Sequence, residues 1–61
     1  MKSSELIRVL QQDGWKFKRQ KGSHLIFIHS IKAGTLIVPY HGGKEVGKRL
    51  CLKILKKAGL R

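Results

Sequence analysis

His24 is the residue of this chain best suited to acid–base chemistry, and it follows a short run of small and basic residues. An imidazole titrates near neutral pH, so it can take a proton from an attacking hydroxyl or return one to a leaving group. Gly22 lets a phosphate approach the backbone closely, and Lys18 and Lys21 could stabilise the charge that develops on it. The Gly22-Ser23-His24 run is therefore a candidate site for phosphodiester cleavage, although a lone histidine in a strand is more often structural.

The role expected of His24 follows from its surroundings. A strongly positive field disfavours the charged imidazolium, so we expect a neutral His24 that acts as the base. One histidine cannot be base and acid at the same instant. The second proton carrier is water, Tyr40 or His41, and the residues do not choose among them. His29 shares strand parity with Leu25 and Phe27, which predicts a strand-end or core residue.

No metal ion or other cofactor is expected. The good soft ligands are the three histidines and Cys51, and their spacing matches no structural zinc motif. Three acidic residues are too few for a magnesium-type carboxylate cluster.

Charge is the strongest compositional signal. Fourteen Lys and Arg against three Asp and Glu give a formal net charge of +11. Such a field favours polyanions, so nucleic acid is the first expected partner, followed by an acidic protein and then a membrane surface. The predicted substrate-binding residues are Lys16, Lys18, Arg19, Lys21, Gly22, Ser23, His41 and Lys44. A second basic face is predicted at Lys48, Arg49, Lys53 and Lys56, and an ordinary solvated face is the alternative for both clusters.

Length and cysteine content limit the class of protein. Residues 1–61 are expected to form a single domain, which buries only about 60% of the surface of its unfolded chain. The lone Cys51 is typical of a reducing compartment. No signal peptide is evident, and no apolar run approaches the ~20 residues that span a bilayer. A cytoplasmic protein without a membrane partner is therefore expected.

Two helices are predicted at the ends of the chain. Residues 3–13 place their apolar side chains on one arc, with Ser3 as the cap and Gly14 as a left-handed end. The third helical position would then be Leu6, so no complete capping box is expected. Residues 45–58 form the second amphipathic pattern, with Leu50 in its apolar arc and Leu52 among the charges.

Three strands are predicted between the helices, over residues 15–20, 23–29 and 35–40. Parity puts His24, Ile26 and Ile28 on one face of the middle strand, and periodicity does not say which face meets the helices. The predicted fold is α+β in the order α-β-β-β-α. It has a three-stranded antiparallel sheet with both helices on one face.

Five short segments carry a resemblance to the HicA-type, or YcfA-like, toxins of bacterial toxin–antitoxin modules. They cover essentially the whole chain and occur in the same order as in that family. The segments are Ser3-Ser4-Glu5-Leu6, Asp13-Gly14-Trp15, Gly22-Ser23-His24, Val38-Pro39-Tyr40-His41 and Ile54-Leu55-Lys56-Lys57-Ala58-Gly59-Leu60.

The resemblance implies a fold like that of a double-stranded-RNA-binding domain, with His24 as the catalytic residue. It implies a metal-independent endoribonuclease that cleaves mRNA, inhibits translation and is neutralised by a HicB-type antitoxin. A non-catalytic RNA-binding module of the same fold remains an alternative, and it needs the basic faces but not His24. A small interaction subunit for an acidic protein is a further alternative, which the exposed position predicted for Leu52 would suit.

Overall fold

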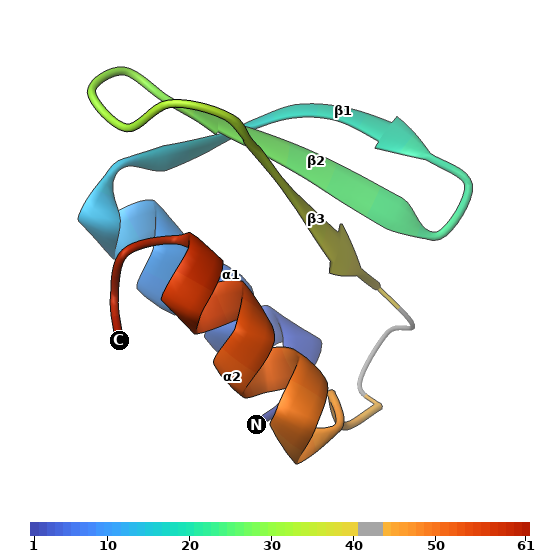
Figure 1. Ribbon diagram of the computed structural model, residues 1–61. Coiled ribbons are helices and arrows are strands. Elements are labelled where there is room, and N and C mark those ends of the chain that lie inside the picture. The colour runs from blue at the N-terminus through green and yellow to red at the C-terminus, as the bar shows by residue number, and fades with distance from the viewer. Residues whose placement is uncertain (41–43) are drawn as a thin grey trace.

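Three strands lie between two helices in the computed structural model, which describes residues 1–40 and 44–61 (Figure 1). The elements are α1 (Ser3–Asp13), β1 (Trp15–Lys21), β2 (His24–His29), β3 (Thr35–Pro39) and α2 (Lys48–Lys57). The predicted order α-β-β-β-α is confirmed.

The sheet is antiparallel in the order β1-β2-β3, and both helices lie against the same face of it (Figure 1). Alternate strand residues point at the helices, because successive side chains of a strand alternate between its faces. The core therefore joins side chains of the sheet to one stripe of each helix. Its buried members are Leu6, Leu10, Trp15, Phe27, Leu36, Val38, Val46, Cys51, Ile54 and Ala58.

The start of α1 differs from the prediction. Lys2, not Ser3, is the N-cap, and Ser3 is a buried residue of the first turn. Glu5 thereby becomes the third helical residue, and its carboxylate accepts the Lys2 backbone N–H at 3.0 Å. An otherwise orphaned backbone donor is satisfied in this way. The other end of α1 is as predicted, because Gly14 adopts the left-handed conformation with φ of 111°.

The second helix begins three residues later than predicted, at Lys48. Glu45 forms an antiparallel bridge with Lys2, and the Val46 N–H donates to the Met1 carbonyl at 2.9 Å. This non-local pairing holds residues 45 and 46 in an extended conformation and overrides the local helical pattern. Leu50, predicted in the apolar arc, is 41% exposed, whereas Leu52 is partly buried beside Val46 and Cys51.

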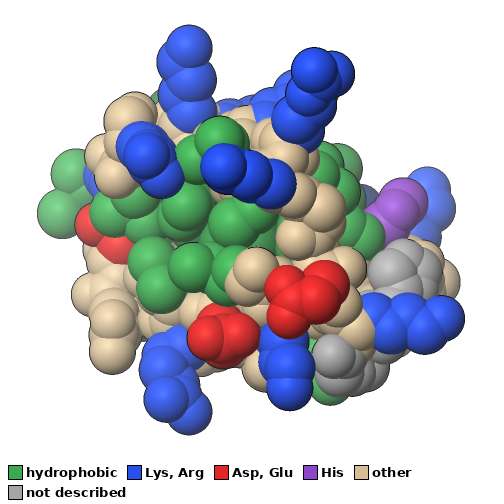
Figure 2. All heavy atoms as spheres, turned by 90° about the horizontal axis from the view of Figure 1, so that it is seen from below, with side chains coloured by type: hydrophobic (Ala, Val, Ile, Leu, Met, Phe, Trp, Pro, Cys, Tyr) green, Lys and Arg blue, Asp and Glu red, His purple; other side chains and the backbone are tan. Residues whose placement is uncertain are grey.

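Seen from the helix side, apolar side chains gather in the middle of the surface, and Lys and Arg side chains project around them (Figure 2). A pocket beside α2 has Met1, Val46, Cys51, Leu52 and Leu55 among its lining residues.

A β-bulge in β1 changes which side chains share a face. Phe17 lies opposite Phe27, but the next matched pair is Arg19 with Ile26, so Lys18 is an extra residue in the strand. Beyond the bulge, Lys21 lies opposite His24. The bulge therefore moves Arg19 and Lys21 onto the sheet face that lies away from the helices.

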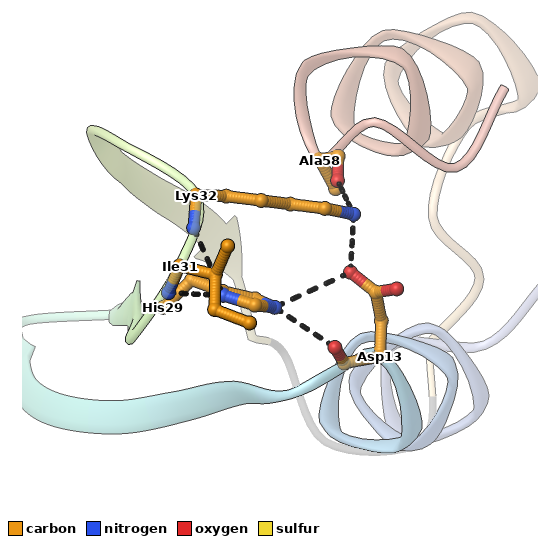
Figure 3. A network of polar contacts seen from close by, with 5 residues as sticks. All are labelled: Asp13, His29, Ile31, Lys32 and Ala58. Atoms are coloured by element: carbon orange, nitrogen blue, oxygen red, sulfur yellow. Dashed lines mark hydrogen bonds and ion pairs between the residues drawn. The ribbon is translucent and has the colours of Figure 1, made fainter.

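His29 belongs to a polar bracket that ties the ends of α1, β2 and α2 together (Figure 3). Its Nδ1 accepts the backbone N–H groups of Ile31 and Lys32 at 3.0 and 3.1 Å. A nitrogen that accepts carries no proton, so the ring is the neutral Nε2–H tautomer. That N–H donates to the Asp13 carbonyl at 2.8 Å. The side chain is 5% exposed, which confirms His29 as a buried strand-end residue.

Lys32 completes the bracket from the connection between β2 and β3. Its Nζ donates to Asp13 Oδ2 at 2.6 Å and to the Ala58 carbonyl at 2.9 Å (Figure 3). The second of these contacts satisfies a carbonyl at the end of α2. One lysine side chain therefore joins both helices to the sheet.

Acid is expected to weaken this bracket. The hydrogen bond from Lys32 holds the pKa of Asp13 below its ordinary value. A carboxyl whose folded-state pKa is lowered stabilises the fold above its unfolded pKa, and this contribution is lost as the pH falls through the folded value. Denaturation between about pH 6 and about pH 2 should therefore show a shallower loss of stability in Asp13→Asn than in the unmodified chain. Glu45, whose pKa is also lowered, contributes equally to both curves. If both proteins lose stability equally as the pH falls, the ionised Asp13 carboxylate does not stabilise the fold.

Candidate functional site

His24 lies on the sheet face that no described element covers. We call this face the open sheet face. It consists of three rows of side chains that the strand register places side by side. From the β1–β2 turn onward the rows are Lys21, His24 and Pro39, then Arg19, Ile26 and Ile37, then Lys16, Ile28 and Thr35. The three β1 residues thus form a column of cations, and the isoleucines of β2 and β3 form an aliphatic floor beside it.

A shallow depression surrounds His24. Its lining residues are Lys21, Gly22, Ser23, His24, Ile26 and Ile37. His24 is solvent-exposed, and Lys21 is its direct cross-strand neighbour. Directly opposed side chains have Cβ atoms about 5 Å apart. The Lys21 ammonium can therefore reach an anion that is held against the imidazole.

The turn between β1 and β2 sets this pairing. Gly22 and Ser23 are its two central residues, and Gly22 has φ of 59° whereas Ser23 has a negative φ. A positive φ at the first central position alone is the pattern of a type II′ hairpin, which matches the twist of the strands. The Gln20 side-chain amide donates to the Gly22 carbonyl at 2.8 Å and braces the turn.

Replacing Gly22 with alanine is expected to destabilise the chain by about 1–2 kcal/mol, because an L-residue pays a steric penalty at positive φ. No atom lies within 4 Å of the new Cβ, so the loss comes from the backbone alone. Gly47→Ala is the matched control, since Gly47 has φ of −55° and its Cβ also meets open space. Urea denaturation should show a clearly larger loss at Gly22 than at Gly47, whose replacement affects only the N-cap of α2. Equal effects would contradict this account of the turn.

The structure brings together part of the predicted substrate-binding set. Lys21, Gly22 and Ser23 adjoin His24. Arg19 lies one row away and Lys16 two rows away, at the far end of the open sheet face.

Two other predicted residues stand apart from that group. Lys18 occupies the bulge. Lys44 is exposed ahead of α2, and it does not line the depression. His41 lies outside the described residues.

Tyr40 points to the other side of the sheet from His24. Its backbone N–H donates to the Ser23 carbonyl at 2.7 Å, which continues the β2–β3 ladder by one residue. Pro39 is paired with His24, so alternation places the Tyr40 side chain on the helix side. Tyr40 is thus poorly placed to exchange a proton with a substrate held at His24.

Sequence reasoning missed the contribution of β3 to the site. Ile37 lines the depression because the β2–β3 register places it beside Ile26. The alternation within residues 35–39 indicated that Ile37 lies on the opposite face from Leu36 and Val38. Without the β2–β3 register it did not show that this is the face of His24. The aromatic residues of the strands, Trp15, Phe17 and Phe27, all lie on the helix side. The open sheet face therefore offers cations and aliphatic surface but no aromatic stacking platform among its described residues.

Possible metal ligands are dispersed in the part of the chain that the structure describes. No group of three or more His, Cys, Asp or Glu residues there could hold an ion. His24 and His29 point to opposite faces of β2, and Cys51 is buried in the core. Within the same residues, no helix has the length and apolar character needed to cross a bilayer.

These features define a small basic α+β domain that presents an exposed histidine on an uncovered sheet face. Its sequence matches the model of a protein family, described as HicA toxin of bacterial toxin-antitoxin, over residues 3–60. The chain therefore belongs to the HicA toxin family, which confirms the resemblance drawn from its motifs. It is 41% identical over 61 residues to a protein named "Probable mRNA interferase HicA" from Pseudomonas fluorescens (strain Pf0-1). That alignment covers 100% of this chain and 98% of the relative.

Proposed function

We propose that this chain is the toxin of a type II toxin–antitoxin system and cleaves mRNA as a metal-independent endoribonuclease in the cytoplasm. The observation that carries the proposal is His24, exposed beside Lys21 on the open sheet face of a HicA family member. The name of the Pseudomonas relative, an mRNA interferase, supports the same activity.

The reaction proposed for His24 is an internal transesterification. The neutral imidazole removes the proton of the ribose 2′-hydroxyl, and the 2′-oxygen attacks the adjacent phosphorus. The bond from phosphorus to the 5′-oxygen of the next nucleotide breaks as the new bond forms. The departing oxygen takes a proton, which leaves a 2′,3′-cyclic phosphate and a 5′-hydroxyl. Water and His41 remain the candidates for the donor of that proton.

The neighbours of His24 have separate roles in this reaction. The ammonium of Lys21 stabilises the charge on the non-bridging phosphate oxygens as the transition state forms. Arg19 and Lys16 continue the column of cations along β1 and hold the phosphates that follow. Ile26 and Ile37 form an aliphatic floor beneath the ribose at the cleavage site.

A toxin of this family has a cognate antitoxin in its module. We propose that this partner is of the HicB type and that it silences the enzyme by covering His24. The lack of any described cover over the open sheet face supports the need for such a partner. It would also neutralise a chain whose net charge is +11.

The test is incubation of the purified chain with a structured mRNA in the presence of EDTA. Cleavage that survives EDTA and ends in cyclic phosphates supports the proposal. Binding without cleavage supports the alternative, a non-catalytic RNA-binding module. In that case the salt dependence of RNA binding reports the number of phosphate contacts. Each neutralised phosphate of a single strand contributes about −0.7 to the slope of log K against log salt concentration. A flat salt response would contradict both functions.

Tyr40→Phe is expected to retain the cleavage rate of the unmodified chain, because the phenol points away from His24. The substitution removes one hydroxyl and keeps the ring, so the fold is expected to persist. Initial rates on a short RNA substrate measure the effect. A loss of about a hundredfold or more, the size expected for a general acid, would instead identify Tyr40 as the proton donor.

A further inference from the structure

The β3 strand ends the sheet with an unpaired edge. It is the last strand in the order β1-β2-β3, and it borders the sheet above α2 (Figure 1). In the part of the chain that the structure describes, its backbone has no strand partner other than β2. Such an edge is a ready template for another strand.

The register identifies the backbone groups that face outward. The Tyr40 N–H bonds to the Ser23 carbonyl, and antiparallel pairs alternate between hydrogen-bonded and non-hydrogen-bonded. Leu36 and Val38 therefore direct their backbone groups at β2, whereas Thr35 and Ile37 direct theirs away from the sheet. Pro39, which has no N–H, falls at an outward position. Two N–H donors and the neighbouring carbonyls are thus available along this edge.

The two edges of the sheet differ in how they are protected. The β1 edge has a bulge and the charged residues Lys16, Lys18, Arg19 and Lys21, which are the usual defences against strand pairing. The β3 edge has neither a bulge nor a charged residue of its own over Thr35–Val38. Its Ile37 side chain is 51% exposed. The chain therefore blocks pairing along β1 and leaves β3 open over Thr35–Val38, up to the outward-facing Pro39.

The neighbouring helix makes this edge attractive to an acidic strand. A groove between β3 and α2 is lined by Leu36, Ile37, Leu50, Lys53, Ile54 and Lys57. Leu50 is 41% exposed, and both lysines are exposed on the side of α2 next to β3. None of the three acids of the chain lines the groove: Glu5, Asp13 and Glu45 accept hydrogen bonds from Lys2, Lys32 and Met1. The two lysines are therefore available to an external carboxylate.

We propose that β3 is the docking edge for a fourth strand, supplied by an acidic segment of a partner protein. The backbone of that segment pairs with Thr35 and Ile37. Its alternate side chains place carboxylates against Lys53 and Lys57 on the helix side and apolar groups beside Ile37 on the open sheet face. A second copy of this chain is disfavoured, because edge pairing would bring the lysines of both copies together. The inference does not rest on the proposed nuclease activity.

The probe for this edge is a short, capped peptide of alternating valine and glutamate, added to the isotope-labelled chain. The expected result is slower hydrogen exchange of the Thr35 and Ile37 amides, because strand pairing gives both N–H groups an acceptor. A peptide with lysine in place of glutamate should have no effect. If saturating acidic peptide leaves these two amides unprotected, the proposal is overturned.

Charge variants separate a specific groove from general attraction to a basic protein. Lys53→Gln with Lys57→Gln is expected to weaken binding on the order of tenfold, the effect of losing two surface ion pairs. Lys48→Gln with Lys56→Gln removes the same charge from α2 at positions that do not line the groove, and it should leave binding unchanged. Equal losses in the two variants would overturn the proposal.

Two further outcomes would reassign the edge. An RNA oligonucleotide that protects the same amides more strongly than the peptide would make β3 a nucleic-acid surface. Amide protection that grows with protein concentration without peptide would make it a self-association surface. Either result would overturn the acidic-strand proposal, and RNA cleavage assays on the same samples report separately on the nuclease function.

Discussion

His24→Ala is expected to abolish detectable RNA cleavage while the fold and the affinity for RNA remain. Removal of a general base typically lowers a rate by about a hundred- to ten-thousandfold. His24 is exposed, and its ring makes no hydrogen bond with the residues that the structure describes. Its loss should therefore change the free energy of unfolding by no more than about 0.5 kcal/mol. Cleavage of a labelled RNA, binding of a non-cleavable analogue and urea denaturation measure the three quantities.

Two controls make this result specific. Thr35→Ala truncates another exposed residue of the open sheet face, two rows from His24, and should keep the rate of the unmodified chain. Added imidazole should restore part of the activity of His24→Ala, because a small base can occupy the vacated position. If His24→Ala cleaves RNA as fast as the unmodified chain, His24 is not the base and the proposed mechanism is wrong.

The same substitution at the other described histidine should have the opposite outcome. His29→Ala is expected to lower the free energy of unfolding by about 3 kcal/mol. It removes a side chain that is 5% exposed and whose ring centroid lies 5.1 Å from that of Trp15. It also leaves the backbone N–H groups of Ile31 and Lys32 without their acceptor. In a domain this small, the loss corresponds to a Tm lower by about 10–20 °C.

Gly14 provides an independent check on His29. A Cβ at Gly14 would lie 2.8 Å from His29 Nε2, at a residue whose φ is 111°. Gly14→Ala is therefore destabilising through both the backbone and the ring. In the His29→Ala background the clash is absent, so the two losses should sum to more than the double variant shows. Strict additivity would indicate that the bracket is not organised as the structure shows.

Local patterns in the sequence determined which elements form and which residues are candidates for the chemistry. Apolar spacing and the left-handed Gly14 predicted the extent of α1 and its C-terminal end, because helix periodicity and a glycine C-cap are local properties. Strand parity also separated His24 from His29, since alternation along β2 needs no knowledge of the neighbours. The short segments shared with the HicA family then assigned the fold and its class.

Other features were decided by contacts between distant residues. The start of α2 moved to Lys48 because residues 1 and 2 pair with residues 45 and 46, a partnership that no local pattern records. For the same reason, the helical pattern did not show that Leu50 borders β3 instead of entering the core.

The site itself depended on a single extra residue. Without the bulge at Lys18, the alternation of β1 would turn Lys21 toward the helices and leave Gln20 opposite His24. The residues of β1 are the same with and without the bulge. The sequence therefore identified His24 and the nearby cations as candidates, but it did not show which cation lies opposite His24. Only the folded sheet selected Lys21 as the neighbour of His24, because register is set by the packing of both strands and by the Gly22 turn that joins them.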